Sequence, residues 1–405
     1  MKICIVTPEY PPDNWGGLAR TVERVAHHAC CLGMNVQVAH FSVLDDSVIL
    51  LDENRSTRID QGITVHRIKV TRQPILAGYR GVGDSPHIRA VKMLYQSLEI
   101  LHDEEKFDLF HSFFLYPAGY VSGLLARRFG VRSIVSLVGN DVKRHFFQPE
   151  AVAMCKSGLE NAGLVTALSS ELLELADALT PIRRKSALIY NSVAIPPSQW
   201  IPRTLRSDPY RIGSAGIFKY AKGLPYLFKA VAGLSKRHKV SVELVGEVRE
   251  YERETVDRMI ERTGIGAILT LRKAVPRDLI HDWLLSLDTF VLPSISEGCP
   301  NILMEAMACG VPTVATKVGA VPDLIEDGVS GLIAPYGNAE ALENTLDKLM
   351  SLPDGGASLG RAARIRMERF SPAWENQEWR KIYQRLMDVN KGAGHKISRR
   401  PLDKI

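Results

Sequence analysis

Two glutamates separated by seven residues, Glu297 and Glu305, mark the stretch of this sequence that is richest in chemistry. Glu297 follows a short apolar run, Thr289–Leu292, which is typical of a buried parallel strand. The helix that carries Glu305 has a natural end at Gly310, and a second apolar run follows at Thr313–Thr316. The pattern predicts a strand–helix–strand unit with Glu297 at the carboxyl end of a strand, where open α/β sheets bind ligands.

The first turn of that helix offers backbone amides to an anion, because the amides of residues 299–303 have no acceptor within the helix. A carboxylate such as Glu305 suits a diol better than a phosphate, since it can accept hydrogen bonds from two adjacent hydroxyls. The combination favours a ligand with both phosphates and hydroxyls, such as a nucleotide sugar. For the spacing alone, an ordinary unit with two solvated acids is the alternative.

The segments 296–301 and 305–312 resemble the E-x7-E signature of the retaining glycosyltransferase family 4, including positions between the glutamates. The sequence departs from that signature at Cys299, where the family usually has a large apolar residue. The resemblance implies an α/β protein of the GT-B fold. In that fold two Rossmann-like domains, each with a doubly wound parallel sheet, face a central cleft.

The resemblance also implies roles for residues of the C-terminal half. Glu297 would orient hydroxyls of the donor sugar, and Glu305 would hold the ribose. The residues expected to approach the donor sugar and phosphates are Gly298, Cys299, Pro300, Asn301 and Ile302. The backbone near Ala274 and Val275 falls where the family holds the nucleoside base.

Residues 216–224 resemble the family's G-R-x-x-x-x-K-G segment, whose arginine and lysine clamp the donor diphosphate. Lys222 matches the lysine, and a cation there would offset the negative charge that builds on the departing diphosphate. Ile217 stands in place of the arginine and cannot replace a guanidinium. Lys219 is the nearest residue that would compensate. Without the resemblance, Lys222 would be an ordinary surface lysine.

The N-terminal half contributes weaker candidates. Gly16 and Gly17 follow the first predicted strand and resemble the family's glycine-rich loop, whose amides approach the diphosphate. His111 stands in a D-x-x-H pattern that the family also has, although a core or strand-capping histidine is an equal alternative. Val138 fills the place of the histidine in the family's His-Gly-x-Asp segment.

Asp141 matches the acidic position of that segment and would hold a hydroxyl of the sugar or acceptor, while also capping the helix that follows. Asn140 lies beside it, and His145, one helical turn on, would partly replace the missing imidazole. The expected catalytic set is therefore Glu297, Asp141 and Lys222.

Length and composition are those of a globular chain. With 405 residues, 45% hydrophobic and 24% charged, the chain can bury two cores. Its net charge of +6 is modest, and solvated lysines explain it as well as an anionic donor or membrane surface does. Six scattered cysteines argue against a metal site or a disulfide framework and favour a reducing cytosol. We expect a cytoplasmic protein and leave peripheral membrane contact open.

The expected organisation is an acceptor-side domain over residues 1–198 and a nucleotide-sugar domain over 199–372. A helix over 373–391 would cross back to the first domain, and 392–405 would be a disordered tail. The polar stretches 44–62 and 71–86 predict mobile loops that select the acceptor.

Two expected element ends bear on the site: a strand over 210–215 that stops before Ile217, and a helix that starts at 275–278.

The resemblance as a whole implies a metal-independent, retaining, hexosyl-type transferase without a permanently bound cofactor. Its donor would be a UDP-, GDP-, ADP- or dTDP-sugar, and its acceptor a hydroxyl of a lipid, glycan or small aglycone. It would be a monomer or homodimer without a nucleic-acid partner. The alternatives are a non-catalytic nucleotide-sugar-binding assembly partner and a sugar-nucleotide epimerase.

Overall fold

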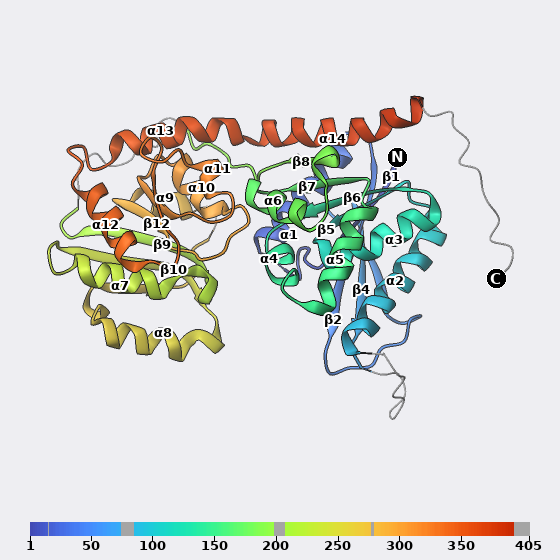
Figure 1. Ribbon diagram of the computed structural model, residues 1–405, viewed down its shortest axis with the longest axis horizontal. Coiled ribbons are helices and arrows are strands. Elements are labelled where there is room, and N and C mark those ends of the chain that lie inside the picture. The colour runs from blue at the N-terminus through green and yellow to red at the C-terminus, as the bar shows by residue number, and fades with distance from the viewer. Residues whose placement is uncertain (15, 74–84, 198–206, 277–278, 393–405) are drawn as a thin grey trace.

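A computed structural model describes residues 1–14, 16–73, 85–197, 207–276 and 279–392 of the chain (Figure 1). In this part of the chain an eight-stranded sheet and a six-stranded sheet form two separate α/β domains. Strands within each sheet are parallel, apart from one antiparallel edge strand, β3, in the first. This arrangement confirms the predicted fold class.

The first domain is built on its sheet in the strand order β3-β4-β2-β1-β5-β6-β7-β8. In that order the strands are Arg55–Asp60, Ile63–Thr71, Asn35–Leu44, Lys2–Thr7, Leu109–Phe113, Arg132–Leu137, Leu164–Ala167 and Ser186–Leu188. Its α-helices are α1 Gly17–Cys31, α2 Pro86–Glu105, α3 Tyr120–Phe129, α4 Asn140–His145, α5 Pro149–Asn161 and α6 Ser170–Leu179. A π-helical turn, η1, spans Leu115–Gly119, and a short 3-10 helix, η2, spans Arg183–Lys185.

Alternate residues of β1 explain how this sheet is covered on both faces. Ile3 and Ile5 pack with α1, whereas Cys4 and Val6 pack with α2 and α3. All four side chains are fully buried, as expected for a central parallel strand whose side chains point alternately to the two faces.

The second domain has the strand order β11-β10-β9-β12-β13-β14. In that order the strands are Leu269–Arg272, Val240–Val248, Tyr210–Phe218, Thr289–Leu292, Thr313–Thr316 and Leu332–Ala334. Its α-helices are α7 Leu224–Leu234, α8 Glu250–Thr263, α9 Ile280–Leu285, α10 Asn301–Ala308, α11 Val321–Leu324, α12 Ala339–Met350 and α13 Ala357–Met367. Short 3-10 helices are η3 Tyr220–Lys222, η4 Gly266–Ile268 and η6 Glu368–Phe370. The unit β12–α10–β13 has the strand bounds that the sequence predicts.

The last helix of the described chain, α14 (Pro372–Gly392), runs along both domains (Figure 1). At its start Trp374 packs against the core of the second domain. Further along, Trp379 and Tyr383 are buried in the core of the first domain beside α1. The helix therefore straps the two domains together.

Three sequence expectations about element bounds were wrong. Residues 55–60 form the edge strand β3 rather than part of a mobile loop, because they pair with β4 although most of their side chains are exposed. Strand β9 continues to Phe218 and so contains Ile217, since β10 extends beside it. Helix α9 begins at Ile280, and Arg277 and Asp278 lie outside the described residues.

Among the described helices, none is both long enough and apolar enough to span a membrane.

Candidate functional site

The ion pair between Lys222 and Glu297 is the centre of the candidate site. Lys222 Nζ donates to Glu297 Oε1 at 2.6 Å, and Ser294 Oγ donates to the same oxygen at 2.6 Å. The Glu297 side chain is 10% exposed and that of Lys222 is 23% exposed, so a ligand can still reach both. The short contacts to Ser294 and Lys222 hold the Glu297 carboxylate in one orientation.

The backbone brings the two charged residues together, although 75 positions separate them. Gly223 follows Lys222 with φ +68°, and a Cβ there would lie 1.9 Å from the carbonyl oxygen of Pro293. Only glycine fits this contact. The amide of Ile295 donates to the carbonyl of Ala221 at 2.9 Å, which joins η3 to the turn after β12.

We call residues 297–301, between that turn and α10, the 297–301 loop. The amide of Ala320 donates to the carbonyl of Gly298 at 2.8 Å. Because the C=O and N–H of a trans peptide point in opposite directions, this bond fixes the direction of the Cys299 amide. Pro300 caps α10, and within the described chain the amides of Asn301 and Ile302 have no backbone acceptor. They are available to an anion.

Asn301 and Cys299 serve this loop differently. Asn301 Oδ1 is buried and has no hydrogen-bond partner among the described residues, so it can accept from a ligand. The Cys299 thiol is buried in the core of the second domain, 3.7 Å from Met304 Sδ. Burial raises its pKa to about 12, so the thiol stays protonated and acts as a small apolar side chain.

Other predicted residues of the second domain lie at known places around this centre. Glu305 is partly exposed, one turn inside α10. Ala274 is exposed and Val275 is half-buried, just after β11. Ile217 lies near the end of β9 and is 41% exposed. Its apolar side chain offers no positive charge at this position.

The first domain contacts the 297–301 loop through glycines. A Cβ on Gly298 would lie 2.3 Å from the carbonyl oxygen of Val138, and one on Gly139 would lie 3.3 Å from Gly298 Cα. Gly17, at the start of α1, would place a Cβ 3.5 Å from Asn301 Nδ2. Two of the predicted glycines, Gly17 and Gly298, therefore lie with Gly139 along one seam between the domains.

A residue that the sequence analysis missed, Glu9, lies beside this seam. A Cβ on Gly16 would be 3.0 Å from Glu9 Oε2, so the carboxylate sits under the start of α1. Burial raises the pKa of Glu9, while a hydrogen bond from the Ala19 amide and the charge of Lys219 act to lower it. Lys219 therefore lies near an acid of the first domain, whereas Lys222 pairs with Glu297.

The structure favours the core alternative for His111. Its side chain is fully buried, with Nδ1 2.9 Å from Tyr383 Oη and Nε2 2.9 Å from Ser136 Oγ. Burial lowers its pKa to about 3, so the imidazole is neutral. His145 ends α4 with its ring edge-on to Tyr116, at a centroid distance of 5.3 Å.

Asn140 and Asp141 belong to α4, but their side chains lie outside those that the structure describes. Sequence reasoning also missed Ser294 and Glu9. Ser294 stands three residues before a glutamate and Glu9 follows a strand, but neither spacing is distinctive.

Family models match both halves of the chain. Residues 16–192 match the glycosyl transferase 4-like domain, and residues 200–366 match glycosyl transferases group 1.

An uncharacterized glycosyltransferase of Methanocaldococcus jannaschii is 26% identical over 340 residues, which are 81% of this chain and 86% of that protein. A D-inositol 3-phosphate glycosyltransferase of Paenarthrobacter aurescens is 31% identical over 176 residues. That match spans 42% of each chain, so it covers less than half of the relative.

Two solved structures share the fold. Sucrose-phosphate synthase of Thermosynechococcus elongatus superimposes with a TM-score of 0.74 at 19% identity, covering 96% of this chain and 99% of the other. Anabaena HepE, in complex with UDP and glucose, gives a TM-score of 0.71 at 20% identity, covering 95% and 100%. The fold is GT-B.

Proposed function

Because the chain belongs to the group 1, family 4-like glycosyltransferases, we propose that it is a retaining enzyme that transfers a hexosyl group from a nucleoside diphosphate sugar to an acceptor hydroxyl. The observation that carries the proposal is the partly exposed Lys222–Glu297 ion pair at the seam between the domains. A nucleotide sugar offers phosphates to the lysine and hydroxyls to the glutamate.

Donor binding exchanges partners within this pair. The diphosphate takes over the Lys222 ammonium, and Glu297, still held by Ser294, turns its free oxygen to hydroxyls of the sugar. As the bond from the anomeric carbon to the phosphate oxygen breaks, Lys222 offsets the charge that develops on the leaving diphosphate. The amides of Asn301 and Ile302 add donors at the same place.

Retention follows from attack on the face that the diphosphate leaves. The acceptor oxygen forms a bond to the anomeric carbon as the bond from that carbon to the phosphate oxygen breaks. The proton of the acceptor hydroxyl passes to the departing phosphate oxygen. The fixed cation and amides do the work that a divalent cation does elsewhere. We therefore propose that the transfer is metal-independent.

The remaining predicted residues take supporting roles. Glu305 holds the ribose, the backbone at Ala274 and Val275 borders the base, and Lys219 supplements Lys222 in place of the absent arginine. The acceptor lies against the first domain, near α4, where Asp141, Asn140 and His145 are the candidates. The enzyme works in the cytoplasm on a lipid, glycan or small aglycone.

A thermal-shift panel of UDP, GDP, ADP and dTDP, with their common sugar conjugates, tests the proposal. A ligand that binds only the folded protein raises its melting temperature. We expect one base to give a shift, which Lys222→Met diminishes. If no nucleotide shifts the melting temperature, the site does not bind a donor and the proposal fails. Turnover of a nucleotide sugar without any acceptor would indicate an epimerase instead.

A further inference from the structure

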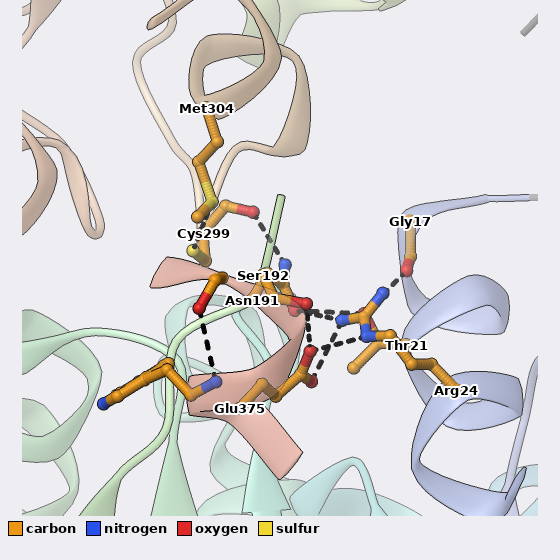
Figure 2. A network of polar contacts seen from close by, with 10 residues as sticks. Gly17, Thr21, Arg24, Asn191, Ser192, Cys299, Met304 and Glu375 are labelled. Atoms are coloured by element: carbon orange, nitrogen blue, oxygen red, sulfur yellow. Dashed lines mark hydrogen bonds and ion pairs between the residues drawn. The ribbon is translucent and has the colours of Figure 1, made fainter. Parts of the chain in front are cut away.

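The buried side chain of Asn191 lies where four segments of the chain meet (Figure 2). They are α1, the 297–301 loop, α14 and the link between the domains, by which we mean the chain between β8 and β9. Its residue exposure is 3%, and it belongs to no helix or strand. Nothing in the proposed reaction uses it. Its contacts nevertheless join the second domain's loop to the first domain's helix.

The two ends of this one amide face different domains. Asn191 Nδ2 donates to the carbonyl oxygen of Cys299 at 3.1 Å. Asn191 Oδ1 accepts from Thr21 Oγ1 at 3.1 Å and lies 3.5 Å from an Arg24 nitrogen. Since an amide carries both donors and an acceptor, this orientation gives the Cys299 carbonyl a donor and offers Thr21 and Arg24 an acceptor.

The same point is tied to α14. Arg24 makes a bidentate pair with Glu375, with Nε to Oε2 at 2.6 Å and a terminal nitrogen to Oε1 at 3.1 Å. The Glu375 side chain is only 2% exposed, and Ser192 Oγ also donates to it. Bidentate pairs of this kind, with one partner buried, hold both side chains in one geometry (Figure 2). The ion pair with Glu375 therefore fixes the position of Arg24, and Arg24 in turn helps to orient Asn191.

Consecutive carbonyls of the 297–301 loop are thus held from two sides. Ala320 of the same domain holds the carbonyl of Gly298, at 2.8 Å. Asn191, from the link, holds the carbonyl of Cys299. Thr21 Oγ1 also lies 3.0 Å from the carbonyl oxygen of Gly17, the residue that abuts Asn301. The Thr21 hydroxyl has one proton and donates to one of these two acceptors at a time, so the hydrogen bonds from the loop through Asn191 reach α1 at Thr21 and Arg24.

We propose that Asn191 is a positioning residue for the transfer reaction: it sets the 297–301 loop, and with it Glu297, against the glycine turn of the first domain. The proposal rests on the proposed function. Asn191 touches no substrate. It acts by fixing the distance between the half of the site that holds the donor and the half that receives the acceptor.

The substitution Asn191→Asp removes the donor function of the amide and keeps its acceptor function. A carboxylate keeps the acceptor toward Thr21 and Arg24 but faces the Cys299 carbonyl with a negative oxygen, so this bond is lost and replaced by repulsion. A matched control is Asn161→Asp in α5. Asn161 likewise donates to a backbone carbonyl, that of Ser157 at 2.9 Å, and lies 3.5 Å from an arginine, Arg127.

The first measurement needs no substrate. Small-angle X-ray scattering of the full-length parent and both variants compares their radii of gyration. We expect Asn191→Asp to be more expanded, because the loop and α1 separate, and Asn161→Asp to match the parent.

The second measurement uses UDP and UDP-glucose as probes, extended to the donor that the thermal-shift panel selects. We expect Asn191→Asp to bind UDP within about twofold of the parent but to lose kcat about tenfold or more, because separation of the two halves of the site affects the reaction and not the diphosphate. A lower melting temperature with unchanged kcat per folded molecule would mean a purely structural role and would overturn the proposal. Scattering and kcat that both equal the parent's would also overturn it.

A parent that turns over no nucleotide sugar contradicts the proposed function, and scattering alone then decides whether Asn191 holds the domains together.

Discussion

The two domains build their shares of the site by different means. The second domain presents charged side chains, with Lys222 Nζ 2.6 Å from Glu297 Oε1. The first domain presents backbone at Val138 and Gly139, which lies so close to Gly298 that a Cβ there would be 2.3 Å from the Val138 carbonyl oxygen. Chemistry carried by side chains tolerates small backbone shifts, whereas a site formed by close backbone approach depends on the fit between domains. Substitutions in the two domains should therefore fail in different ways.

The largest effect is expected for Lys222→Met. The variant keeps the approximate length of the side chain but removes the cation that we propose offsets charge on the leaving diphosphate, so kcat should fall about 10²–10³-fold. Steady-state kinetics with the selected donor measures it. Lys229→Met, an exposed lysine on α7, is the control and should keep the parent's rate. A fall below threefold at Lys222 would remove it from the reaction.

Gly298→Ala tests the fit between domains without touching a charged group. Its Cβ would lie 2.3 Å from the Val138 carbonyl oxygen, so the domains must move apart, and we expect kcat to fall about tenfold to hundredfold. Gly266→Ala is the control, because its Cβ would meet only an Ile260 methyl at 3.6 Å. Equal rates in the two variants would show that the close approach is irrelevant to turnover.

Glu305→Ala should weaken donor binding rather than chemistry. Loss of a charged acceptor for the ribose hydroxyls predicts a donor KM about tenfold higher, with kcat nearly unchanged. The melting temperature without ligand should stay near the parent's, since Glu305 is partly exposed. If neither KM nor kcat changes, Glu305 does not hold the donor.

The smallest effect concerns Glu9 and the pH dependence of stability. Burial raises the pKa of Glu9, so the folded protein keeps this proton to a higher pH than the unfolded chain does. Its contribution to the free energy of unfolding therefore falls as pH rises from the ordinary carboxyl pKa through the raised one. Glu9→Gln stays neutral, so its melting temperature relative to the parent should be higher at about pH 7 than at about pH 4. A constant difference would mean that the carboxyl titrates normally.

Much of the second domain could be predicted from the sequence because its signals are local. The strand Thr289–Leu292, the helix start at Pro300 and the strand Thr313–Thr316 follow from apolar runs and from the places of proline and glycine. By contrast, β3 has a burial pattern without alternation, and only its pairing with β4 makes it a strand. Local patterns cannot report a contact of that kind.

Contacts between site residues that lie far apart in the sequence could not be predicted from local patterns for the same reason. Lys222 and Glu297 were each identified, but the ion pair between them depends on Gly223 fitting against Pro293. No local pattern marks Asn191, and the role proposed for it depends on three other segments folding around it. His111 shows the opposite case, since its family-like pattern coexists with complete burial against Tyr383.

The place of α14 in the chain has a consequence for biosynthesis. Domains fold as units while a chain is made, and the N-terminal one folds first. Because α14 follows both domains, it leaves the ribosome only after each sheet can already have formed. Until then, the apolar side chains of the first domain that pack with Trp379 and Tyr383 lack this cover. Translation thus delivers two preformed halves, and docking of this single helix completes the enzyme.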